Sequence, residues 1–100
     1  MDRLKDIVHK VISEYAKDGL NCYSYLTQSN DGTLLTVVDI EHTPETHDMD
    51  ISVVVRILGN RIVIERDMND KLVVDALIQA GIPRSQIILA YAGEPVPETA

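Results

Sequence analysis

The fold is decided by the stretch ISVVVRILGNRIVIER, residues 51–66. Two runs rich in β-branched residues, 51–58 and 61–66, flank the pair Gly59-Asn60. Glycine accepts the positive φ angle that a type II′ turn requires, so the stretch predicts an antiparallel β-hairpin. The opposed pairs expected from this turn are Ile57 with Ile62, Val55 with Ile64, and Val53 with Arg66.

The predicted hairpin is apolar on both faces. Successive side chains of a strand point to opposite sides, so Val55 and Ile64 share one face while Val54 and Val63 lie on the other. Two helices readily cover one face of a small sheet. We therefore expect the second face to meet the C-terminal segment, another copy of the chain or a partner protein.

A helix and a short strand are expected after the hairpin. Asn69 is a candidate helix cap, and Gly81 followed by Pro83 predicts where the helix ends. Residues 87–91 are an apolar run that predicts the last strand. Between cap and stop lies one apolar stripe at helical spacing: Val73, Val74, Leu77 and Ile78.

The N-terminal half predicts one helix and two strands. Residues 1–18 carry an apolar stripe at three- and four-residue spacing, with Asp2 as a candidate cap. The remaining expected segments are a strand at 22–28, a turn at 29–32, a strand at 33–40 and a polar loop at 41–49.

The expected order of elements is α-β-β-β-β-α-β. This order indicates an α+β fold: an antiparallel sheet of four to five strands with two helices packed on one face. We expect a single domain over residues 1–92 and a flexible C-terminal tail over residues 93–100, where Pro95 and Pro97 fall.

Residues 61–89 combine a strand with an acidic end, a helix, the stop Gly81-Ile82-Pro83, a polar triplet and an apolar strand. In this order of parts the chain resembles the XisI family, the cyanobacterial controlling factors for excision of the fdxN element. The resemblance implies an XisI-like fold and a role in controlling programmed, site-specific DNA excision. It also implies a partner, XisH, a small protein that resembles nucleases.

The charge of the chain is concentrated in one segment. The formal net charge is −7, and residues 29–50 hold six carboxylates with no lysine or arginine. A chain without a basic stripe is a poor candidate for direct DNA binding, because phosphate neutralisation supplies most nonspecific affinity. Direct binding to DNA would have to use four scattered arginines: Arg56, Arg61, Arg66 and Arg84.

The cysteine content and hydropathy indicate a cytoplasmic protein. The single Cys22 cannot form an internal disulfide, which fits a reducing compartment. No apolar run approaches the roughly 18 residues needed to span a bilayer.

Sequence motifs favour a protein without catalytic residues, metal or cofactor. No glycine-rich phosphate loop, nucleophile elbow or paired-cysteine motif occurs. The alternative is a small metal-binding protein or metal-dependent enzyme that uses the two histidines, His42 and His47, of the polar loop. Their four-residue separation, interrupted by Pro44, is not that of a helical ligand pair.

These observations favour a regulatory protein that acts by binding other proteins. The candidate contacts are four carboxylates of the acidic segment, which would attract a basic partner, and two valines of the second sheet face. The alternative for the acidic segment is a solvated connection that keeps the chain soluble. The candidate residues are Glu41, Glu45, Asp48, Asp50, Val54 and Val63.

Overall fold

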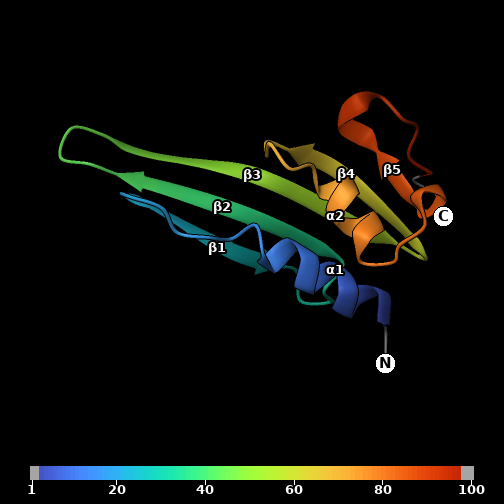
Figure 1. Ribbon diagram of the computed structural model, residues 1–100. Coiled ribbons are helices and arrows are strands. Elements are labelled where there is room, and N and C mark those ends of the chain that lie inside the picture. The colour runs from blue at the N-terminus through green and yellow to red at the C-terminus, as the bar shows by residue number, and fades with distance from the viewer. Residues whose placement is uncertain (1–2, 98–100) are drawn as a thin grey trace.

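The computed structural model describes residues 3–97. Figure 1 traces the chain through two α-helices and five strands. Two short 3-10 helices, η1 (Arg84–Gln86) and η2 (Ala90–Ala92), flank the last strand. The main elements are α1 (Arg3–Ser13), β1 (Cys22–Gln28), β2 (Leu34–His42), β3 (His47–Leu58), β4 (Arg61–Asp67), α2 (Val73–Gln79) and β5 (Ile87–Leu89).

The five strands form one sheet in the order β1-β2-β3-β4-β5. The α+β class and the order of elements are confirmed. Strands β1 to β4 are antiparallel, but β5 pairs with β4 in parallel. The expectation of a wholly antiparallel sheet is wrong for β5, because α2 carries the chain back to the end where β4 began.

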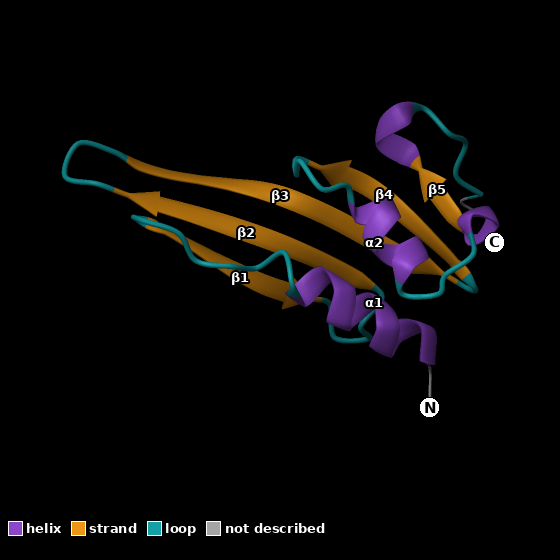
Figure 2. Ribbon diagram, in the orientation of Figure 1, coloured by secondary structure: helices purple, strands orange, loops and turns teal. Residues whose placement is uncertain are grey.

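Both α-helices lie on the same face of the sheet, as Figure 2 shows. Their predicted stripes form the core with the inward side chains of β2, β3 and β4. Ile78 is the exception within these stripes, because its side chain is 41% exposed. The helix residues buried in this core are Val8, Val11, Ile12, Val73, Val74 and Leu77.

Helix α1 ends at Ser13, five residues earlier than predicted. The Ser13 hydroxyl donates to the Lys10 carbonyl at 2.7 Å, and the next turn is closed by tighter bonds such as Tyr15 N–H to Ile12 O. Asp18 then accepts from the Ser24 N–H at 3.0 Å, which directs the chain into β1. The predicted cap at Asp2 lies outside the described residues.

The β3–β4 hairpin has two of its three predicted pairs. Ile57 lies opposite Ile62 and Val55 opposite Ile64. The third pair is wrong: Val53 lies opposite Asp67, because the register shifts between Val54 and Val55. A bulge places an extra residue on one strand and moves every later pair by one position.

The cap of α2 also differs from the prediction. The carboxylate of Asp67 accepts from the Val73 N–H at 2.6 Å and from the Asn69 N–H at 3.1 Å. Asn69 is therefore not the cap but part of the turn that Asp67 organises. The predicted stop is confirmed: Gly81 has φ +102°, and the Ile82 N–H bonds to the Leu77 carbonyl at 3.0 Å.

The predicted polar loop at 41–49 is wrong. Strand β2 continues to His42 and β3 begins at His47, so residues 43–46 form a tight turn at the end of a long hairpin. The turn is closed by the Thr43 N–H to Thr46 O bond at 2.9 Å. Polar side chains suit these strand ends because both faces of the sheet are open to solvent there.

The C-terminal segment covers part of the second sheet face. Val63 and Ile88 are buried although they do not belong to the core beneath the helices, and η2 lies close to β4. Glu94 ties the segment down by accepting from the Leu89 N–H at 2.7 Å and from Arg84 at 3.0 Å. The last part of the predicted tail, residues 98–100, lies outside the described residues.

Candidate functional site

The long β2–β3 hairpin extends beyond the helices and beyond the end of β4, at the left of Figure 1. We call residues 38–51 the arm. Strand β1 pairs with one edge of the arm, whereas β4 ends opposite Val53. The arm thus has two open faces, and the alternation of its strands separates acidic from apolar side chains.

The face on the helix side of the arm is acidic. Two pairs of carboxylates lie directly opposite each other across β2 and β3, Asp39 with Asp50 and Glu41 with Asp48. Like charges in opposed positions destabilise a sheet. A small hollow of about 210 Å³ on this face is lined by the four carboxylates with Cys22 and Met49. The arm therefore concentrates negative charge where strand pairing alone disfavours it.

Two of these carboxylates have partners of their own. Asp39 accepts from the Ser24 hydroxyl at 2.5 Å, and Asp50 lies 3.5 Å from the Arg66 guanidinium. Glu41, Asp48 and the turn residue Glu45 are exposed. The structure thus brings Glu41, Asp48 and Asp50 together on one face and places Glu45 at the end of the arm.

The opposite face of the arm is apolar. Cross-strand pairing produces two rows of three side chains, Tyr25–Val38–Ile51 and Tyr23–Ile40–Met49. We call these six residues the bare face. A hollow of about 530 Å³ on it is lined by Val38, Met49, Ile51 and Val54, with Asp50 and Arg66 at its edge.

The two predicted valines differ in solvent exposure. Val54 is half-buried and adjoins the bare face, whereas Val63 is fully buried within the single chain. Sequence reasoning missed all six residues of the bare face. The alternation of 22–28 can be read from the sequence, but a loop expected at 41–49 ends the alternation of β2 and β3 too early to predict the bare face.

The two histidines of the alternative interpretation meet across the end of the arm. The ring centroids of His42 and His47 are 5.3 Å apart, because the two residues pair directly. Within residues 3–97, no three histidine, cysteine or acidic side chains gather closely enough to hold a metal ion. A metal site needs further ligands, typically four in a structural zinc site.

Three of the four arginines considered for DNA binding lie in ion pairs. Arg56 contacts Glu65 at 2.7 Å, and Arg66 and Arg84 contact Asp50 and Glu94. Paired guanidinium groups present less positive potential to a phosphate backbone than free ones do.

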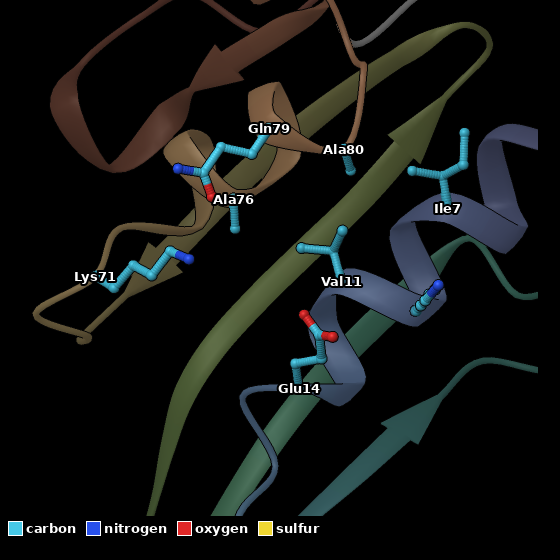
Figure 3. A pocket seen from close by; sticks show the side chains of 8 residues that line it. Ile7, Val11, Glu14, Lys71, Ala76, Gln79 and Ala80 are labelled. Atoms are coloured by element: carbon cyan, nitrogen blue, oxygen red, sulfur yellow. The ribbon is translucent and has the colours of Figure 1, made fainter.

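A groove between the two helices is shown in Figure 3. It has a volume of about 390 Å³ and is lined from α1 by Ile7, Lys10, Val11 and Glu14 and from the α2 region by Lys71, Ala76, Gln79 and Ala80. Among residues 3–97 no polar or charged side chain is fully buried. The groove thus lacks the desolvated titratable group that is typical of catalytic sites.

The hydroxyls of Tyr15 and Tyr91 both lie near carboxylates. Partial burial, reinforced by the nearby Asp67 and Asp75 charges, raises the pKa of both hydroxyls. The Tyr15 hydroxyl donates to the Lys71 carbonyl at 3.0 Å. This bond joins the segment after α1 to the segment before α2, so the tyrosine has a structural role.

None of the described helices is long and apolar enough to cross a membrane.

Comparisons with known proteins agree with this architecture. A XisI-like protein from Anabaena variabilis has a TM-score of 0.77 and 16% identity, over 97% of this chain and 89% of that one. The fdxN element excision controlling factor XisI from the same organism has a TM-score of 0.68 and 20% identity, over 95% and 92%. No curated protein matches the chain. The family model for XisI protein matches residues 1–99, so the chain belongs to the XisI family.

Proposed function

We propose that this chain is a non-enzymatic regulatory factor in the control of programmed, site-specific DNA excision, and that its arm binds a basic partner protein. The family membership and the shared fold with an excision controlling factor support the process. The resemblance to XisI suggests a nuclease-like XisH-type protein as the partner. That protein or a separate recombinase would carry out the strand chemistry.

The observation that carries the proposal is that two pairs of acidic residues occupy opposed positions on the arm. The Glu41–Asp48 and Asp39–Asp50 positions place like charges across neighbouring strands, which costs stability. A basic partner would relieve this repulsion and would be steered toward the arm by its potential. A solvated connection that only confers solubility would have no need of opposed carboxylates.

The test compares two double variants of equal charge change. Glu41→Gln with Asp48→Asn neutralises the acidic face, and Glu14→Gln with Asp70→Asn neutralises exposed carboxylates away from the arm. Affinity purification from the native host first identifies the partner, and stopped-flow mixing then gives association rates across a salt series. The arm variant is expected to associate roughly tenfold more slowly, with a shallower salt dependence.

The matched control variant should retain the rate and salt dependence of the unmodified chain. An equal decrease in the association rates of both double variants would show that only net charge matters. It would remove the arm as the contact site. Unchanged rates for both would leave the acidic segment as a solvated hairpin.

A further inference from the structure

We infer that the bare face is a two-fold homodimer interface, in which the rows Tyr25–Val38–Ile51 and Tyr23–Ile40–Met49 pack against the same rows of a second copy. The helices cover the other sheet face over its centre, and the C-terminal segment covers the second face only near β4 and β5. The tyrosines are 50% and 52% exposed and Met49 is 66% exposed. Contiguous apolar side chains on a soluble chain mark an interaction surface.

The chain exposes more surface than a compact monomer of its mass. The chain exposes 6360 Å², which is about 700 Å² more than a folded monomer of 11.1 kDa is expected to expose. Its radius of gyration of 14.1 Å likewise exceeds the roughly 13 Å of a compact 100-residue domain. A standard interface buries about 800 Å² per partner, which is similar in size to this whole-chain excess.

The distribution of charge favours a second copy over a charged partner. Three strand carboxylates of the arm, Asp39, Glu41 and Asp48, lie on the opposite face, because they alternate with the bare-face residues along β2 and β3. The fourth, Asp50, reaches the edge of the bare face, where it pairs with Arg66. The cations that adjoin this side, Arg56 and Arg66, are paired with Glu65 and Asp50. Two chains that each carry a net charge of −7 can therefore meet here with one carboxylate per chain at the edge of the contact, and that carboxylate is paired with an arginine.

A second copy of the chain presents the same bare face to the contact. Two sheets pack face to face about 10 Å apart when each presents a flat, apolar side, and a two-fold axis pairs one patch with itself. Tyrosine and methionine are enriched in such interfaces. In this arrangement both acidic faces remain outward, so a dimer would offer two sites for a basic partner.

The decisive experiment measures mass in solution for two variants of the same residue type. Ile51 on the bare face and Ile78 on α2 are each 41% exposed, so Ile51→Lys and Ile78→Lys add the same charge at equal exposure. Sedimentation equilibrium between about 1 and 100 µM chain covers the affinities that an interface of this size commonly has. We expect twice 11.1 kDa for the unmodified chain and for Ile78→Lys, and 11.1 kDa for Ile51→Lys.

Circular dichroism checks that each variant is folded, and Met49→Lys replaces Ile51→Lys if the latter is not. A monomeric unmodified chain, or a lysine variant on the bare face that remains dimeric, overturns the inference. A monomer that loses partner binding on Ile51→Lys would assign the face to a different protein and also overturns it. The proposed function is tested separately, because Glu41→Gln with Asp48→Asn should leave the dimer intact.

Discussion

At the scale of single residues, two isoleucine-sized side chains on the same helix have opposite roles. Leu77 is fully buried beneath α2, while the adjacent Ile78 is 41% exposed. Both belong to the stripe predicted from the sequence, so helical spacing alone does not separate them. The difference arises because α2 has only seven residues. The stripe of side chains that it buries against the sheet is narrower than its full set of apolar residues.

Leu77→Ala is expected to lower the free energy of unfolding by about 2–5 kcal/mol, because it leaves a cavity in the core. Urea denaturation at neutral pH measures this loss. Ile78→Ala serves as the control and should cost less than about 1 kcal/mol. Equal losses for the two variants would mean that α2 packs in a different rotation.

The turn that contains Asp31 lowers the pKa of its carboxyl group. Its carboxylate accepts from the Ser29 hydroxyl at 2.7 Å and from the Thr33 hydroxyl at 2.8 Å. The Thr33 N–H donates to the same oxygen at 3.1 Å. These bonds favour the charged form and lower the pKa of Asp31 to about 2.

Because the folded pKa lies below the ordinary value of 3.8, the ionised carboxylate stabilises the fold above about pH 4. That contribution is lost as the pH falls toward 2. Urea midpoints measured across this window should fall less steeply for Asp31→Asn than for the unmodified chain. Thr33→Val removes one donor and should give an intermediate slope, whereas parallel profiles for all three chains would contradict the assignment.

At the scale of elements, the arm departs most from the sequence-based expectation. Residues 41–49 contain Pro44, two histidines and three carboxylates, a composition that is typical of loops. The backbone nevertheless continues as paired strands, because each strand end supplies hydrogen bonds to the other regardless of side-chain polarity. Pro44 is accommodated in the four-residue turn, where no ladder bond is required of it.

The opposed positions of Glu41 and Asp48 should have a measurable effect on the free energy of unfolding. Neutralising either residue should raise the free energy of unfolding by about 0.2–1 kcal/mol, since like charges across a sheet repel. The two gains should not add, because each change removes the same repulsion. Urea denaturation of both single variants and the double variant tests this.

Higher stability together with slower partner association would identify residues retained for binding. If both single variants are less stable than the unmodified chain, the two carboxylates contribute to the fold instead. That outcome would remove the argument for the acidic face.

At the scale of the whole molecule, the sheet has three environments. Its centre is covered by both helices, its β4–β5 end is covered on the second face by the C-terminal segment, and the arm is covered on neither side. The principal extents of 46 × 30 × 26 Å record this elongation. A long, two-faced arm suits a chain that completes its burial by association.

Association should appear in thermal melts. A dimer that forms from folded chains shifts the unfolding equilibrium by mass action, so the Tm should rise with chain concentration. The unmodified chain and Ile78→Lys are expected to show this rise between about 1 and 100 µM, and Ile51→Lys is not. A Tm that is independent of concentration for all three would indicate a monomer.

The sequence by itself determined the α+β class, the order of the elements and most of the core. Alternation in 51–66 and helical spacing in 73–78 are local patterns, and the burial of Val55, Ile64 and Leu77 follows from them. The order of parts in 61–89 likewise pointed to the XisI family, which the family model over residues 1–99 confirms. These properties depend on neighbours along the chain, so they can be inferred from residue spacing.

Tertiary structure alone decided the parallel pairing of β5, the bulge at Val54–Val55 and the length of the arm. Each depends on which strand lies beside another in space. The same pairing separates the acidic from the apolar side of the arm, because a strand presents alternate residues to opposite faces once its partner fixes its orientation. Val63 and Val54 looked alike in the sequence, and only the packing of the C-terminal segment buries the first and leaves the second half-open.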